Sequence, residues 1–328
     1  MNPGKKIFGT LIIPSIASLI AAILCAFGHV MLFDSAATWL VFVRSIVSVS
    51  IVTFALSINL GTGRFDFSIG SVSLLTSTIV LKLALSLNLS PILTILFSVV
   101  IGAILGFLSG GVYVITKLPA IIVSLGVTLF YEGLAYTITG GHGVSIVINE
   151  GLMNFKTIPN FVTIGIIVLI FIVIVFDHTV FGYDYKALIT GQTIAVNIGI
   201  NENLNALICY AISGGLMGIY GFISATTNGV VSMSLNFGSI SPMFIAFLPM
   251  FIGGFIGKYS NDKLGYVIGG FVSALISVIF IRFNVDSSVQ QIITAVILVL
   301  FLIYLNNQGL LKKIVDSLKR NKLGQVQA

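Results

Sequence analysis

Charged side chains are what this sequence has least of. Only 8% of its 328 residues are Asp, Glu, Lys or Arg, whereas 57% are hydrophobic. Soluble domains carry about 25% charged residues, and a chain of this length cannot cover a water-exposed surface with so few. The shortage excludes a water-soluble protein. It predicts an integral membrane protein, because a lipid bilayer is the solvent that suits such a composition.

Residues and motifs for catalysis, metal binding and nucleic-acid binding are also scarce. The two cysteines, Cys25 and Cys209, fall in apolar runs and are interpreted as small buried hydrophobic residues. The three histidines are far apart, and the motifs GxxxxGK[ST], HExxH and GxSxG are absent. The net charge of +6 is spread between apolar stretches and chain ends rather than gathered with aromatics. We therefore predict no enzyme activity, no metal, no cofactor and no nucleic-acid partner.

Long apolar runs are what the sequence has instead. A transmembrane helix needs about 20 apolar residues, and we expect an all-α polytopic bundle of about ten spans. The third and eighth are the candidates for broken or re-entrant helices. The ten stretches are Ile7–Met31, Thr38–Leu60, Phe67–Leu87, Pro91–Thr116, Pro119–Thr139, Phe161–Phe176, Leu204–Thr226, Ser241–Ile256, Gly265–Phe283 and Val289–Leu305.

The basic residues predict which way the chain crosses the membrane. With the N-terminus inside, twelve Lys and Arg residues fall in inner segments and two in outer loops. Cytoplasmic loops carry such an excess, so both termini are predicted to be cytoplasmic. Arg44 and Lys82 lie within spans near their outer ends, and we expect them to reach the headgroups. Residues 1–306 would form the permease domain, and residues 307–328 a cytoplasmic amphipathic tail.

Two connecting segments are longer than helix bundles need. The outer one covers 140–160, and the inner one, residues 177–203, is polar. We expect the inner segment to form short helices docked to a cytoplasmic partner. Glycines recur every four residues, a spacing that lets helix backbones approach closely. They are Gly102, Gly106 and Gly110, then Gly214 and Gly218, then Gly253 and Gly257.

Two acidic residues stand out among the apolar stretches. Glu132 lies deep in its span, where a carboxylate must find a partner or a water-filled cavity. Asp66 follows a glycine-containing turn and precedes Ser68, so it could cap the next helix or line a path.

Several stretches resemble one protein family. The stretch Asp66-Phe67-Ser68-Ile69-Gly70-Ser71 resembles that family's G-I-D-L-S-V-G-S. In the inner segment, His178-Thr179, Gly182, Ala187-Leu188 and Gly199-Ile200-Asn201 resemble its H-T-x-x-G … A-L … S-G-I-N. Between them lies a match to T-L-G … R-G-L-A … T-G-G, at Ser124–Gly126, Tyr131–Ala135 and Thr139–Gly141. In this order, the stretches resemble the permease subunits of ribose/galactose-type ABC sugar importers, in the branched-chain amino acid/ribose permease superfamily.

The resemblance implies a membrane-spanning importer subunit in a bacterial inner membrane. It would move a small solute, best matched by a monosaccharide. A solute-binding protein, extracellular or periplasmic, would deliver the solute, and a separate ABC ATPase subunit would supply energy. The chain would pair with a second permease copy, as a homodimer or heterodimer. The resemblance assigns coupling to Gly182, Ala187, Leu188, Gly199, Ile200 and Asn201, and the translocation path or its packing to Asp66, Ser68, Gly70, Ser71 and Glu132.

Two alternatives remain at this point. One is a related ABC permease for nucleosides or branched-chain amino acids. The other is a secondary carrier driven by protons through Glu132. The long polar inner segment favours the ABC interpretation, because a secondary carrier has no ATPase to dock.

Overall fold

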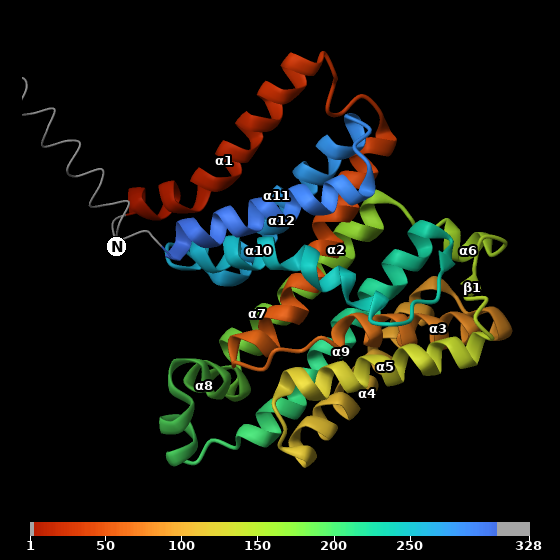
Figure 1. Ribbon diagram of the computed structural model, residues 1–328, viewed down its shortest axis with the longest axis vertical. Helices are drawn as coiled ribbons and strands as arrows, with labels where there is room; N and C mark the ends of the chain where they lie inside the picture. Colours follow the sequence, from red (N-terminus) through yellow and green to blue (C-terminus); the bar gives the residue numbers. More distant parts are fainter. Residues whose placement is uncertain (1–2, 307–328) are drawn as a thin grey trace, which may run out of the picture. The chain divides into compact units, whose positions relative to one another are not determined.

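The protein is almost entirely α-helical, as predicted (Figure 1). The computed structural model describes residues 3–306, so the predicted amphipathic tail at 307–328 lies outside the described residues. Within residues 3–306 the only strands are β1 (Val144–Ser145) and β2 (Val230–Val231), which pair antiparallel. The chain forms two compact units, residues 1–282 and 283–328, and α12 (Ser287–Asn306) is the described helix of the second.

Nine helices of the described part are long and apolar enough to cross a membrane, which confirms a polytopic bundle. The tenth predicted span coincides with α12, whose apolar part, Ser288–Ile303, is shorter. Which side each terminus faces stays a prediction. The nine fall in α1 (Pro3–Gly28), α2 (Ala36–Gly61), α3 (Ile69–Leu87), α4 (Pro91–Thr116), α5 (Ala120–Thr139), α7 (Ile158–His178), α9 (Glu202–Asn228), α10 (Ser241–Gly257) and α11 (Asp262–Arg282).

Capping residues explain where several helices begin and end. The Ser90 hydroxyl accepts the N–H of Leu93, and Pro91 occupies the first turn of α4, where a missing N–H costs nothing. The same helix ends at Lys117 in the left-handed conformation, with φ of 55°. Gly140 ends α5 in that conformation too, with φ of 60°.

The helices differ in how much of their apolar surface the protein itself covers. In the most apolar stretch of α9, 72% of the residues are buried inside the protein, whereas in that of α1 only 6% are. α9 therefore forms the centre of the first unit, against α2, α3 and α4. The apolar faces that α1, α4 and α7 leave exposed are the surface that lipid covers.

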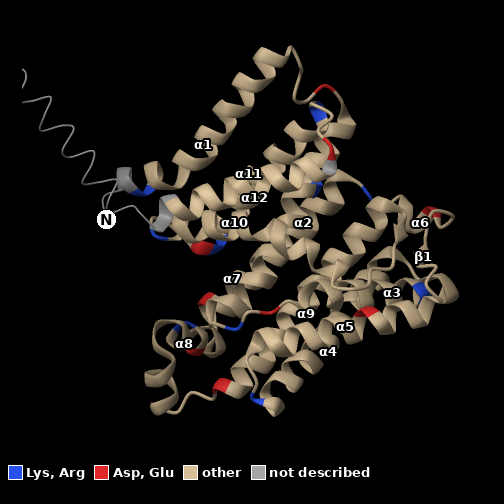
Figure 2. Cartoon of the chain, viewed as in Figure 1, with Lys and Arg blue, Asp and Glu red and all other residues tan. Residues whose placement is uncertain are grey.

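Charged residues lie mainly near helix ends and in connections, with long uncharged stretches between them (Figure 2). The inner segment forms α8 (Val180–Asn197), which is interrupted at Gly191, so short helices are present as predicted. The outer segment holds β1 and α6 (Glu150–Met153). Figure 1 shows α8 and the β1–α6 segment at opposite ends of the bundle.

Candidate functional site

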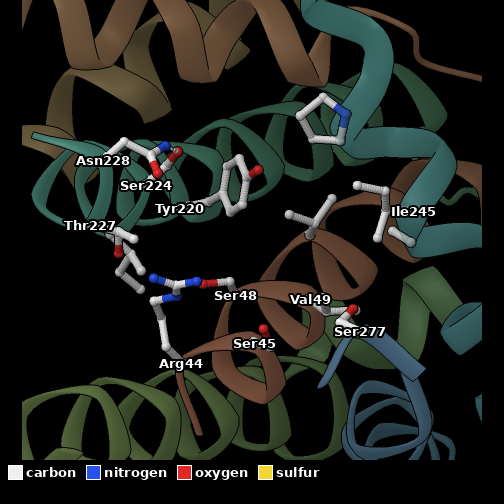
Figure 3. Close-up of a pocket in the computed structure, with 14 residues that line it drawn as sticks. Arg44, Ser45, Ser48, Val49, Tyr220, Ser224, Thr227, Asn228, Ile245 and Ser277 are labelled. Carbon is white, nitrogen blue, oxygen red and sulfur yellow. Dashed lines mark hydrogen bonds between the residues drawn. The ribbon is translucent and has the colours of Figure 1, made fainter. Parts of the chain in front are cut away.

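A polar cleft lies among α2, α3 and α9, within the spans of the first unit. It consists of two adjoining cavities, of about 280 Å³ and 400 Å³. Four residues line both cavities and join them into the polar cleft: Tyr220, Ser224, Asn228 and Pro242. Figure 3 shows the first cavity, with α2 on one side and α9 on the other.

Hydroxyl and amide groups make the lining of the cleft polar. α2 contributes Ser45 and Ser48 to the first cavity, and α3 contributes Ser73 and Ser77 to the second. Among residues 3–306, no Asp or Glu lines either cavity. A concave site with converging neutral hydrogen-bonding groups suits a small polar solute.

Helical spacing places these side chains on common faces. Tyr220, Ser224 and Asn228 recur every four residues on α9, as do Arg44 and Ser48 on α2. Residues four apart lie on one helix face. Our sequence reasoning missed this cleft, although a repeat of polar residues every four positions in an apolar helix was the signal that could have revealed it.

Of the residues that the structure describes, Arg44 is the one charged residue that lines the polar cleft. We expected its side chain to reach the headgroups. Instead, Figure 3 shows the guanidinium extending from α2 toward α9, on the side of Tyr220 and Thr227. Within residues 3–306 the Arg44 side chain forms no ion pair and none of the side-chain hydrogen bonds found there. A guanidinium has five N–H donors, so Arg44 leaves donors free for a solute.

Asp66 organises the segment between α2 and α3. The side chain is 3% exposed and accepts hydrogen bonds from Asn59 Nδ2 at 3.1 Å and from the Ser68 backbone N–H at 2.8 Å. The Ser68 hydroxyl donates a third at 2.6 Å. Asp66 thus holds the turn before α3 and ties it to the end of α2. The N-cap of α3 is Ser68, which makes no side-chain capping bond, so Asp66 is not the helix cap considered from the sequence.

Glu132 organises a second chain reversal, before α10. The residue is fully buried, and its carboxylate oxygens accept the backbone N–H groups of Phe237 at 3.0 Å and Ser239 at 2.9 Å. Phe237 has a φ of 66°, and a short 3-10 helix, η1 (Gly238–Ile240), follows it. The partner that a buried carboxylate requires is therefore backbone.

Two of the five predicted path residues, Gly70 and Glu132, meet at η1, whereas Asp66, Ser68 and Ser71 bond to one another and to Asn59 at the start of α3. A Cβ on Gly70 would meet the Ser239 carbonyl, so the start of α3 and η1 touch backbone to backbone. Ser68 and Ser71 are buried, and the Ser71 hydroxyl donates to the Ser68 carbonyl at 2.8 Å. Of the five, only Gly70 lines the polar cleft. The other four are buried but do not line it, so a role in the path or its packing stays a prediction.

Three of the predicted coupling residues, Gly182, Ala187 and Leu188, lie within α8, which packs against the bundle. Gly182 is buried, and a Cβ there would meet the Phe176 carbonyl of α7. Leu188 is 4% exposed, while Ala187 is half-buried. Between them, Tyr185 places its hydroxyl 3.2 Å from the Ser57 carbonyl and 3.0 Å from the Ile58 carbonyl, at the end of α2.

The other three form the turn between α8 and α9. Gly199 has a φ of 100°, and its N–H donates to the Val196 carbonyl at 3.0 Å. The Ile200 N–H donates to the Ala195 carbonyl at 3.1 Å, which completes a Schellman ending of α8. The Asn201 side chain then accepts the Leu204 N–H at 3.0 Å and caps α9.

The outward face of α8 carries apolar side chains that the sequence analysis did not single out. Val180, Tyr183, Ile194 and Ile198 are between 61% and 76% exposed. α8 is not one of the candidate spans of the described residues. Exposed apolar groups beside charged ones are typical of a protein docking surface.

An ion cluster holds the base of α8 to its neighbours. Asp177, at the end of α7, accepts from Lys186 of α8 at 2.7 Å and from Lys263 of α11 at 2.9 Å. Lys263 also contacts Asp262 at 3.0 Å. The α8 segment is thereby linked to two spans.

Comparison with known proteins matches this architecture to a family. Residues 40–305 match the family described as branched-chain amino acid transport system / permease component. The chain belongs to this family. This permease is a multi-pass protein of a bacterial inner membrane and a transport subunit, which confirms the resemblance seen in the sequence.

Individual relatives of the permease are distant but cover most of its length. The autoinducer 2 import system permease protein LsrC of Photorhabdus luminescens is 23% identical over 317 residues, covering 92% of each chain. LsrC of Enterobacter sp. (strain 638) is 25% identical over 250 residues, covering 72% of this chain and 69% of its own. The fructose import permease protein FrcC of Rhizobium meliloti is 24% identical over 260 residues, covering 73% and 72%. No solved structure is significantly similar to the chain.

Proposed function

We propose that this permease imports a small hydroxylated solute, best matched by a monosaccharide, through the polar cleft. The observation that carries the proposal is the lining of the cleft, which offers hydroxyl and amide groups from four spans, α2, α3, α9 and α11. Such groups match the alternating donors and acceptors of a sugar. The relatives include a fructose import permease and autoinducer 2 import permeases.

The lining also weighs against the related substrates. A branched-chain amino acid carries an ammonium group, and no carboxylate lines the cleft to receive it. A nucleoside offers a base for stacking, and Tyr220 is the only aromatic residue in the lining. These features favour a sugar over both.

The energy source in this proposal is a separate ABC ATPase seated on α8. The chain lacks a nucleotide-binding motif, and the exposed face of Val180, Tyr183, Ile194 and Ile198 gives the ATPase an apolar contact. Within α8 and its end, the proposed coupling residues shape this surface rather than contact the partner: they are Gly182, Ala187, Leu188, Gly199, Ile200 and Asn201. A second permease copy and a solute-binding protein complete the complex, as in ABC importers generally.

The hydrogen bonds of Glu132 support the ABC interpretation over the proton-driven alternative. Both Glu132 carboxylate oxygens accept backbone N–H groups, which is the arrangement of a structural carboxylate. These two hydrogen bonds hold the turn before α10, so the carboxylate of Glu132 already has a structural task.

Uptake by the complete complex tests the proposal. The permease, its ATPase and its binding protein are reconstituted in proteoliposomes, and uptake of labelled monosaccharides, leucine and nucleosides is compared. We expect ATP-dependent uptake of a monosaccharide. Ser224→Phe, which fills the cleft, should abolish uptake, whereas Ile104→Phe, on the exposed face of α4, should leave it unchanged.

Other outcomes would replace the proposal. Uptake of leucine or a nucleoside instead of sugars would establish one of the related ABC substrates. Uptake that persists without the ATPase would show a secondary carrier. Equal rates in the two Phe variants would remove the polar cleft as the path.

A further inference from the structure

The charge of the polar cleft has one sign. Arg44 supplies a positive charge, and no acidic side chain lines either cavity. The carboxylates of Asp66 and Glu132 lie outside the lining, and each is held by hydrogen bonds of its own. A cation within the spans is therefore left without a protein counter-charge.

An unpaired cation within a span is costly to maintain. Charged residues at membrane depth usually pair or mark the path of a substrate. Arg44 has neither an ion pair nor one of the hydrogen bonds found among residues 3–306. Asn228, by contrast, donates to the Ser224 hydroxyl at 3.4 Å within the same cleft. The group that satisfies Arg44 is thus expected to come from the solute.

The geometry points to a solute that bears a negative charge beside its hydroxyl groups, such as a sugar acid, with Arg44 as the residue that selects it. This assignment rests on the proposed function and narrows it. The planar guanidinium donates two parallel N–H bonds to a carboxylate. Ser45, Ser48 and Ser224 line the same cavity, where they can bind the hydroxyl groups of such a solute.

Thiol labelling measures the sign of the potential in the cleft without a known substrate. Cys25→Ser and Cys209→Ala first remove the two native thiols, and Ser224→Cys then places a single thiol in the cleft. Purified complex in nanodiscs reacts with an anionic and a cationic methanethiosulfonate of similar size. Each rate is divided by the rate with a free thiol in solution, which cancels intrinsic reactivity.

We expect the anionic reagent to react faster by roughly tenfold or more, because a unit charge acts strongly in a site of low dielectric. Arg44→Gln should remove this preference, and Arg44→Lys should keep most of it. Lys82→Gln is the matched control: Lys82 is exposed, lies outside the cleft lining and donates to the Ile138 carbonyl at 2.8 Å. It removes the same charge and should leave the preference intact.

A second measurement connects the potential to a solute. Galacturonate, with its counter-ion matched by potassium chloride, and galactose are compared for their ability to slow labelling of Cys at position 224 by a neutral reagent. Galacturonate should slow labelling at concentrations where galactose does not, and Arg44→Gln should abolish the difference.

The outcomes separate this inference from the proposed function. Equal rates for the two charged reagents, or equal effects of the two sugars, would overturn the anion assignment while the cleft remains open to solute. A thiol at 224 that reacts with no reagent would show that water does not enter the cleft, and would overturn the proposed path as well.

Discussion

The carboxylate of Glu132 on α5 accepts the backbone N–H of Ser239, 107 positions further along the chain, at 2.9 Å. Its second oxygen accepts the N–H of Phe237 at 3.0 Å. One side chain thereby satisfies two donors of the chain reversal at 237–239, where Ser239 is buried and Phe237 is 39% exposed. The reversal in turn sets the start of α10 against the start of α3, behind the polar cleft.

Replacing Glu132 should therefore lower the stability of the permease and leave the pH dependence of uptake unchanged. Glu132→Leu removes the acceptor of the Phe237 and Ser239 N–H groups, and leaving the buried Ser239 donor unsatisfied costs about 1–3 kcal/mol. We expect a clear drop in the thermal unfolding midpoint of the purified permease. Glu132→Gln keeps one acceptor oxygen and should fall between wild type and Leu. Uptake by Glu132→Gln should keep the wild-type pH profile, and a variant of normal stability that had lost transport would contradict this role.

The fold was largely predictable because lipid imposes a simple rule. Each span must satisfy its own backbone, so an apolar run of sufficient length becomes a helix. The run Pro91–Thr116 matches α4 at both ends. The residues between spans obey no such rule. The sequence could not show that Glu132 and residues 237–239 meet, because tertiary contact and not local pattern decides that hydrogen bond.

Glycines at the crossing of α4 and α9 give a sharp stability test. A Cβ on Gly214 would meet the Gly102 carbonyl, whereas one on the adjacent Gly215 would find only ordinary contacts, the nearest at 3.4 Å. We expect Gly214→Ala to force the helices apart and lower stability by about 1–3 kcal/mol. Gly215→Ala should be neutral or slightly stabilising, because alanine favours helix. Thermal unfolding of both variants measures the difference, and equal midpoints would refute close packing at this crossing.

The candidate site was less predictable than the fold. Family-like stretches led to Asp66, Ser68 and Glu132, which turn out to be buried supports. Arg44 and Ser224 belong to no such stretch, and they line the cleft. Motifs with glycine and capping residues are visible in one sequence because they depend on local backbone geometry. A cleft depends on which helix faces meet, and that information is spread over four spans.

Gly199 offers a test of the turn that ends α8. Its φ of 100° is strained for residues with a Cβ, yet a Cβ there would contact nothing within 4 Å. Gly199→Asn should be well tolerated, since asparagine also adopts left-handed conformations. Gly199→Trp and Gly199→Val should both cost about 1–2 kcal/mol from the backbone alone.

The two bulky variants also distinguish folding from docking. Binding of the ATPase to each is measured by co-purification from membranes. If Trp blocks binding while Val permits it at equal stability, bulk at position 199 interferes with the partner itself. If both bind, Gly199 serves only to end the helix, and the docking surface lies elsewhere on α8.

Tyr185 is the residue through which α8 holds the end of α2. Its hydroxyl lies 3.0 Å from the Ile58 carbonyl and 3.2 Å from the Ser57 carbonyl, and its ring packs edge-on against Phe176 at 4.8 Å. The last carbonyls of a helix lack partners within the helix, so this contact ties α8 to α2 directly. Arg44 and Ser48, which line the cleft, also lie on α2. A shift of α8 would therefore move α2 and change the position of these two side chains.

Tyr185→Phe should therefore weaken coupling while leaving the fold intact, because the ring stays and one hydrogen bond of about 1 kcal/mol is lost. That energy corresponds to about a fivefold change in an equilibrium, so we expect more ATP hydrolysed per solute, by up to about fivefold. The measurement is the ratio of ATP hydrolysis to uptake in proteoliposomes. Tyr136→Phe is the matched control, because Tyr136 lies on α5, outside α8 and the proposed docking surface, and is 44% exposed. An unchanged ratio in Tyr185→Phe would mean that ring packing alone transmits the motion.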